Sequence, residues 1–182
     1  FTPLGSLPAF GPIVATLAHI PVIIAALVFG PWIGALMGGV FGLFSFIVWT
    51  FMPPSPLAFV FTPFCSLGDF HGNFWSIVIC FVPRILVGVV AGLSLKGFQK
   101  VFRNSSLPFI LSGFLGSITN TILVLAGIYF CFGFQYSQAI GTSQALLLGV
   151  LGASVLTNGI PEAILGSAAG VFIAKPLRKF NK

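Results

Sequence analysis

Five polar side chains in this sequence lie inside long apolar stretches: His19, Arg84, Asn120, Asn158 and Glu162. If those stretches are buried in a bilayer, an unpaired charge at its centre costs at least about 2.5 to 3.5 kcal/mol on the insertion scale. Each charged group therefore needs a partner, from the protein or from a ligand. These five residues are the candidates for binding chemistry, and the surrounding apolar runs are the elements that must position them.

Arg84 and Glu162 are the two ionisable groups with the highest cost of burial. A guanidinium stays protonated, so Arg84 must meet a carboxylate, carbonyl oxygens or water. Pro83 has no N–H, and we expect it to free a backbone carbonyl nearby. Two interpretations stay open: a permanent buried pair of Arg84 with Glu162, or a receptor for an anionic ligand in which the two residues pair when the site is empty.

The three uncharged candidates each have a structural interpretation beside the ligand-binding one. Asn120 can bond a neighbouring helix, and Asn158 can cap a helix that begins near Pro161. For His19 a hydrogen bond between helices is favoured over a metal site, because no second His, Cys or acid stands at ligand spacing. The sequence has no Walker loop, GxSxG, HExxH or paired carboxylates, so we assign no catalytic residue and no metal site.

The composition indicates an all-α integral membrane protein. Hydrophobic residues make up 57% of the chain and charged residues 5%, whereas soluble domains have roughly 25% charged residues. Seven of the eight basic residues lie in residues 96–103 and 175–182. Two short basic flanks are typical of cytoplasmic membrane ends and not of a nucleic-acid-binding face, so nucleic acid is excluded as a partner.

The apolar runs predict a single membrane domain over residues 1–182. The predicted spans are residues 12–29, 33–51, 74–95, 107–132 and 159–177. Residues 52–73 are rich in proline and predict an external loop. Residues 143–157 predict a short outer helix, with a break near Asn158; a kinked continuous helix is the competing interpretation. Small residues at four-residue spacing predict close helix contacts, and they are Gly34, Gly38, Gly42, Gly88, Gly92, Gly166 and Gly170.

The basic flanks orient these spans with residues 96–103 and 175–182 inside the cell. The loop 52–73 and a connection at 133–142 then lie outside, and residues 1–11 form an external connection after a helix that is missing from this sequence. We therefore expect six spans. In this arrangement the five polar candidates fall between the outer third and the midplane. They predict one small pocket that opens outward, under an apolar cap supplied by the loop.

Five segments carry a family resemblance: AHIPVI (18–23), GPWIGALMGG (30–39), FVPRILVG (81–88), GSITNT (116–121) and NGIPEAI (158–164). Together they resemble the substrate-binding S component of an energy-coupling factor (ECF) vitamin transporter, most of all the pantothenate type. The resemblance covers nearly the whole chain.

The resemblance implies a six-helix S-component bundle in the bacterial plasma membrane, with its first helix missing from this sequence. Such a protein is not an enzyme and holds no cofactor. It binds a vitamin and passes it to one transmembrane coupling protein and two ATPase subunits, which bind ATP and Mg. The resemblance also implies that the docking motif for these partners lies on the first helix, which is missing from this sequence.

Pantothenate fits the predicted pocket chemically. Its carboxylate suits Arg84, its hydroxyl and amide groups suit Asn120, Asn158, Glu162 and His19, and its dimethyl group suits apolar walls. Three alternatives stay open. The ligand could be pyridoxine, hydroxymethylpyrimidine or folate; the chain could be a stand-alone secondary transporter or channel; or it could be a structural subunit in which Arg84 pairs directly with Glu162.

Overall fold

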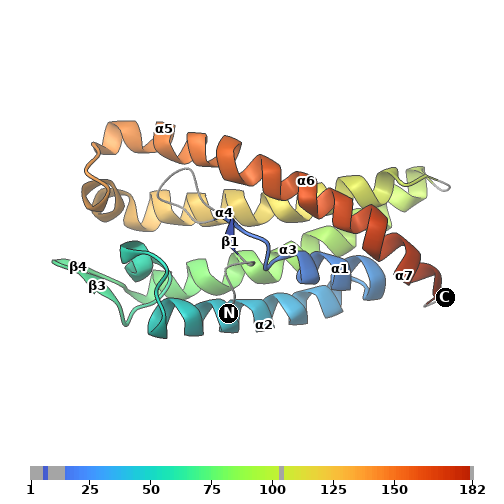
Figure 1. Ribbon diagram of the computed structural model, residues 1–182, viewed down its shortest axis with the longest axis horizontal. Helices are drawn as coiled ribbons and strands as arrows, with labels where there is room; N and C mark the ends of the chain where they lie inside the picture. The colour runs from blue at the N-terminus through green and yellow to red at the C-terminus, as the bar shows by residue number, and fades with distance from the viewer. Residues whose placement is uncertain (1–5, 8–14, 103–104, 181–182) are drawn as a thin grey trace.

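The computed structural model describes residues 6–7, 15–102 and 105–180. Long helices run side by side along one axis (Figure 1). Among the described residues, four helices are long and apolar enough to cross a bilayer. They are α2 (Pro31–Phe51), α3 (Phe74–Val101), α4 (Leu107–Ala139) and a last helix over Gln144–Phe180. The predicted all-α membrane fold is confirmed.

The first predicted span, residues 12–29, is wrong for residues 15–19, which are described and are not helical. Helix α1 covers Ile20–Phe29, and before it β2 (Ala15–Thr16) pairs antiparallel with β1 (Ser6–Leu7). Ten helical residues rise about 15 Å, half of the hydrocarbon thickness. Helix α1 accordingly occupies the half of the bundle that is nearer the C-terminus (Figure 1). Most of the predicted external connection 1–11, and the helix expected before it, lie outside the described residues.

Two other helices end later in the sequence than predicted. Helix α3 continues to Val101 instead of residue 95, and α4 continues to Ala139 instead of residue 132. Most of the predicted connection 133–142 is thus helical. Its two glutamines are good helix formers, which favours this extension of α4. At the start of α3, Asn73 and Ser76 form a capping box that ends the external segment.

The predicted break at Asn158 is also wrong, and the continuous helix is the correct interpretation. The last helix consists of α5 (Gln144–Ser154), the π-turn η3 (Val155–Gly159), α6 (Ile160–Ala169), the π-turn η4 (Gly170–Ala174) and α7 (Lys175–Phe180). Asn158 lies within η3 and is not a cap, because helical dihedrals continue on both sides of it. In η3 the N–H of Ile160 donates to the Val155 carbonyl, five residues back. This wider turn carries the helix past Pro161, so no new N-terminus is needed.

The described residues of both basic stretches lie at one end of the bundle, as the predicted orientation requires (Figure 1). The Lys175 Nζ atom donates to Ser106 Oγ at 2.6 Å, and Arg178 Nη1 donates to the Leu27 carbonyl at 3.1 Å. The turn between α1 and α2 is at the same end (Figure 1). Gly30 makes this turn with φ of 104°, a conformation that side chains rarely adopt.

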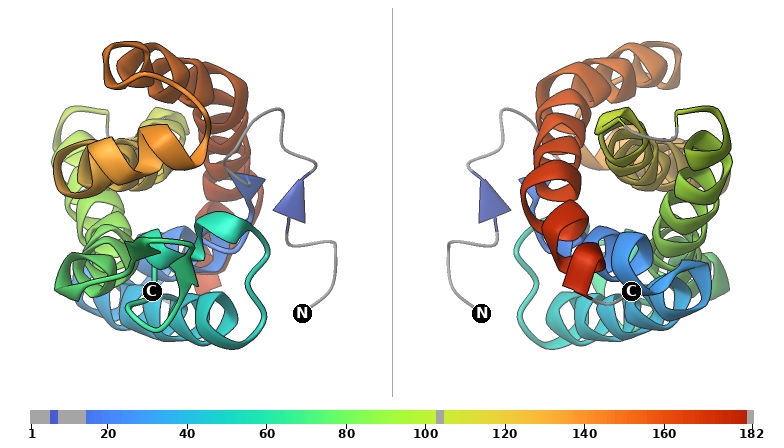
Figure 2. Two further views of the ribbon diagram at one scale, coloured as in Figure 1. Left: turned by 90° about the vertical axis from the view of Figure 1, so that its left-hand side faces the viewer. Right: turned by 90° about the vertical axis from the view of Figure 1, so that its right-hand side faces the viewer.

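The external segment, residues 52–73, lies at the opposite end (Figure 1). It contains the 3-10 helix η2 (Pro56–Val60) and a hairpin of β3 (Ser66–Leu67) and β4 (Phe70–His71). Seen end-on, the helices form a ring at the basic end, where α1 packs between α2 and the last helix (Figure 2).

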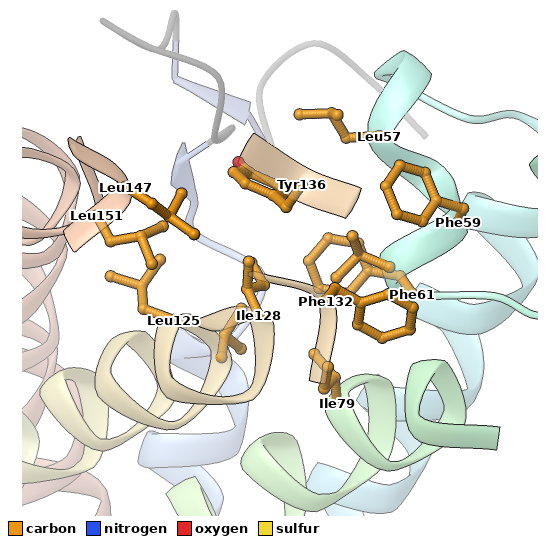
Figure 3. Close-up of a cluster of buried hydrophobic side chains, with 12 residues drawn as sticks. Leu57, Phe59, Phe61, Ile79, Leu125, Ile128, Phe132, Tyr136, Leu147 and Leu151 are labelled. Atoms are coloured by element: carbon orange, nitrogen blue, oxygen red, sulfur yellow. The ribbon is translucent and has the colours of Figure 1, made fainter. Parts of the chain in front are cut away.

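Two buried apolar clusters divide the bundle along its length. The outer cluster joins η2 to α3, α4 and α5, and much of it is visible in Figure 3. The inner cluster joins α1 to α3, α4 and the last helix. The outer cluster includes Leu57, Phe59, Phe61, Ile79, Val124, Ile128, Phe132, Tyr136, Leu147 and Leu151, and the inner cluster includes Val22, Ile23, Leu27, Val87, Ala91, Leu95, Phe109 and Ala174.

Candidate functional site

Buried polar side chains lie between the two apolar clusters on each long helix that contributes to both. On α3, Arg84 lies between Ile79 of the outer cluster and Val87 of the inner cluster. The same order holds on α4 and on the last helix. From these side chains we take Arg84, Ser117, Asn120, Asn158 and Glu162, and with them His19, which immediately precedes α1; all six are buried, and we call them the polar layer.

Arg84 is 7% exposed, and its own helix supplies one of its partners. Its Nη1 atom donates to the Ile79 carbonyl at 2.8 Å. In a regular α-helix that carbonyl would accept from the N–H of residue 83, four positions on. Residue 83 is proline and has no N–H, so Ile79 carries the free carbonyl expected near Pro83.

Two aromatic rings and one carboxylate also act on the Arg84 guanidinium. Its carbon lies 5.4 Å from the centre of the Phe61 ring and 5.8 Å from that of Phe41, within the range of cation–π attraction. Glu162 adds a favourable charge interaction. The Nε atom is buried and has no hydrogen-bond partner within the described part of the chain. One strong donor of the cation therefore has no acceptor among the described residues.

His19 makes the hydrogen bond between helices that the sequence favoured. Its ring is fully buried immediately before α1, and Nε2 lies 2.9 Å from Ser117 Oγ on α4. Ser117 stands one helical turn before Asn120. The bond therefore places the start of α1 beside the polar part of α4.

Asn120 and Thr121 present unpaired oxygens at the same level of α4. Asn120 Oδ1 and Thr121 Oγ1 are both buried and lack a hydrogen-bond partner among the described residues. Thr121 also touches the last helix, since a Cβ atom added to Gly159 would lie 2.8 Å from its methyl carbon. Ser117 and Thr121 were not among the predicted site residues. The run GSITNT, with four polar residues inside an apolar span, is the signal that could have indicated them.

Asn158 and Glu162 lie one turn apart on the last helix, and both face the interior. They are 7% and 6% exposed. Because the helix is continuous, their burial is not explained by capping a helix start. The structure thus brings all five predicted residues into one layer. The links are the His19–Ser117 bond, the contact of Thr121 with Gly159, and the attraction between Glu162 and Arg84.

The external segment covers the polar layer on the outer side. Phe61 stacks on Trp49 with ring centres 4.5 Å apart, and the Thr50 and Thr62 hydroxyls are 2.8 Å apart. Ser76 Oγ donates to the Phe59 carbonyl at 2.7 Å. Phe59 and Phe61 are buried beside Phe132 and Tyr136 of α4 (Figure 3). The segment is therefore apolar where it packs on the bundle, whereas its Phe64 is exposed and lies outside the outer cluster.

The unpaired polar atoms define what the layer can bind. A buried donor or acceptor without a partner costs about 1–3 kcal/mol, so such groups are rare in native interiors unless they serve a purpose. The Arg84 Nε–H group requires an acceptor, best an anion. Asn120 Oδ1 requires a donor, and the Thr121 hydroxyl can act either way. This combination suits a small molecule that carries a carboxylate and also hydroxyl or amide groups.

Sequence comparisons agree with a transport function. The sequence model of the family described as "ECF transporter, substrate-specific component" matches residues 3–174. The chain is 38% identical over 169 residues to a Lactococcus lactis subsp. cremoris protein named "Pantothenic acid transporter PanT", a match covering 92% of this chain and 80% of that protein. It is 32% identical over 172 residues to the "Pantothenate transporter PanT" of Leuconostoc mesenteroides subsp. mesenteroides, covering 90% and 76%.

The family match extends over both apolar clusters and over the polar layer between them. It therefore includes the helices that cross the membrane as well as the residues that converge between them. With these helices the chain is a multi-pass cell-membrane protein and a transport subunit, and it belongs to the family of substrate-specific components of ECF transporters.

Proposed function

We propose that this chain is the receptor subunit of an ATP-driven vitamin importer and that its ligand is pantothenate. The observation that carries the proposal is the buried Arg84 guanidinium, whose Nε–H is unpaired in a layer that also holds an unpaired Asn120 Oδ1. The names of the two PanT relatives support the choice of vitamin.

The groups of pantothenate complement the polar layer one by one. Its carboxylate accepts from Arg84 Nε and becomes the counter-charge of the guanidinium in place of Glu162. Glu162 then accepts from a ligand hydroxyl. The amide and the second hydroxyl meet Asn120, Asn158 and His19. The dimethyl group packs on apolar side chains of the clusters, where its burial is favourable.

The ligand enters this layer from the outer end of the bundle. The external segment stands over Arg84 there, and Phe61 touches both the guanidinium and Trp49. Entry requires this segment to move, because its hydroxyl pair and ring stack cover the layer. The segment connects the end of α2 to the start of α3, so it can move while these helices stay folded.

Transport also requires partners that this chain does not contain. The family relationship supports a transmembrane coupling protein and two ATPase subunits, which bind ATP and Mg and drive release to the inside. The chain itself then holds no cofactor and hydrolyses no ATP. Uptake into vesicles with and without these partners tests this part of the proposal.

The Arg84→Ala variant tests the ligand assignment. Truncating one partner of a buried charge pair costs about 2–5 kcal/mol, so pantothenate affinity should fall by at least roughly 30-fold. Isothermal titration of the purified protein in detergent measures the effect. Arg178→Ala is the matched control, because Arg178 also donates to a backbone carbonyl but lies at the basic end, far from the polar layer.

Two results would contradict the proposal. Undiminished binding by Arg84→Ala would remove Arg84 from the carboxylate role. If the wild-type protein binds pyridoxine, hydroxymethylpyrimidine or folate but not pantothenate, the vitamin assignment is wrong.

A further inference from the structure

We infer that Pro83 is a positioning residue of the binding site, acting through Arg84. This inference rests on the proposed function, because the site that it concerns is the proposed carboxylate site. Its basis is the placement of one hydrogen bond. The acceptor of Arg84 Nη1 is the Ile79 carbonyl, which a proline at position 83 leaves without its helical donor.

The bond controls which atoms of the guanidinium remain available. Arginine has five N–H donors in a fixed plane, so fixing Nη1 fixes the direction of Nε as well. The Phe41 and Phe61 rings limit where the plane can lie. With Nη1 bonded to Ile79, the Nε–H remains unpaired. Pro83 thereby frees a backbone carbonyl that holds Arg84, so no other side chain of the polar layer is needed to orient the guanidinium.

A residue with an N–H at position 83 would weaken this anchor. The N–H of residue 83 would bond the Ile79 carbonyl in the regular helical pattern, in competition with Arg84. The guanidinium would lose its fixed direction while keeping its charge and its burial. The effect on the ligand should therefore concern its carboxylate alone.

The Pro83→Ala variant tests the inference with two ligands. Pantothenate affinity should fall roughly tenfold, the value of one hydrogen bond to a charged group. Affinity for pantothenol, in which an alcohol replaces the carboxylate, should not change. The thermal midpoint of the ligand-free protein should stay the same or rise, because an interior proline is replaced by the best helix former. Pro108→Ala is the control, since Pro108 lies in the first turn of α4, where no helical bond is lost.

A second measurement needs no ligand. The chain contains three arginines, Arg84, Arg103 and Arg178, so 15N-arginine labelling gives a simple spectrum that the Arg84→Ala variant assigns. In the wild-type protein the bond to Ile79 should hinder rotation and keep two separate Nη signals for Arg84. In Pro83→Ala these signals should merge.

Each other outcome has a distinct meaning. Equal losses for pantothenate and pantothenol, or a lowered thermal midpoint, would show that Pro83 shapes the bundle generally and would overturn the inference. Unchanged pantothenate binding with unchanged Nη signals would overturn it as well. If the wild type binds no pantothenate, the proposed ligand fails, and the Nη signals alone decide whether Pro83 orients Arg84. Pro83→Ser supplies the same N–H and replaces the alanine variant if that variant does not fold.

Discussion

Asn120 and Thr119 are neighbours on α4 with opposite hydrogen-bonding states. Thr119 Oγ1 donates to the Leu115 carbonyl of its own helix at 2.6 Å. Asn120 Oδ1 is buried and has no partner among the described residues. The hydroxyl of Thr119 is thus satisfied by its own helix, whereas the amide oxygen of Asn120 lacks a donor. At the scale of single residues, this state distinguishes the proposed binding group Asn120 from the satisfied polar group of Thr119 in the same span.

This contrast predicts different effects of two alanine substitutions. Asn120→Ala should weaken pantothenate binding roughly tenfold, because a ligand donor loses its acceptor, and should leave the ligand-free thermal midpoint nearly unchanged. Thr119→Ala should leave binding unaltered. Titration calorimetry and thermal unfolding in the same detergent measure both effects. Equal affinities of the two variants would exclude Asn120 from the site.

The hydrogen-bond partner of Arg84 is close to it in the sequence, whereas that of His19 is distant. The free carbonyl near Pro83 was predicted because Ile79, Pro83 and Arg84 lie within two turns of one helix. The Ser117 partner of His19 lies 98 residues away. Sequence reasoning could name the kind of bond that His19 makes, but only the packing of α1 against α4 identified Ser117 as its partner.

At the scale of elements, the close packing of α2 on α3 sets the position of Arg84. Gly34, Gly38 and Gly42 are buried against α3, as the four-residue spacing predicted. A Cβ atom at Gly38 would fall on the carbonyl oxygen of Arg84, and one at Gly88 would fall on that of Gly34. Small residues here allow the two backbones to meet, which brings Phe41 of α2 against the guanidinium.

Adding one methyl group at this crossing should therefore disturb both stability and binding. Gly38→Ala forces the helices apart, and overpacking of this kind costs about 1–3 kcal/mol. We expect a lower thermal midpoint together with weaker pantothenate binding, because the backbone of Arg84 must move. Gly39→Ala is the matched control, since a Cβ atom there has nothing within 4 Å. A Gly38→Ala protein as stable as Gly39→Ala would contradict the packing account.

At the scale of the whole molecule, the polar layer is held between two apolar clusters and covered on the outer side. The outer cluster includes Phe59 and Phe61 of the external segment, whereas the inner cluster closes the basic end around α1. A ligand bound in this layer can leave inward only if the inner cluster opens or the whole bundle reorients. In the proposed function, the ATPase partners supply the energy for either change.

Uptake into vesicles checks this expectation. Vesicles that hold the chain alone should bind labelled pantothenate without accumulating it. Accumulation should appear when the coupling protein and both ATPases are present with ATP and Mg, and it should be lost in the Arg84→Ala variant. Accumulation by the chain alone would indicate a stand-alone transporter and would contradict the partner proposal.

The sequence by itself determined the class of the molecule and the depth of its polar residues. Both follow from where apolar runs begin and end, because a bilayer imposes one length and one solvent on every span. For that reason the sequence alone could single out five candidate site residues: His19, Arg84, Asn120, Asn158 and Glu162. Because burying a polar group in a bilayer is costly, polar residues within a span can be recognised as unusual without any knowledge of their neighbours.

Tertiary structure decided where the helices begin and end. Local signals at Asn158 and Pro161 favour a helix start, yet packing against α4 keeps the helix continuous through a π-turn. Helix α1 begins at Ile20 although the apolar run starts earlier. Local propensities differ by only about 1 kcal/mol for most residues, so contacts between distant segments override them. The partners of the polar layer depend on those same distant contacts, which is why the residues could be named in advance but not their arrangement.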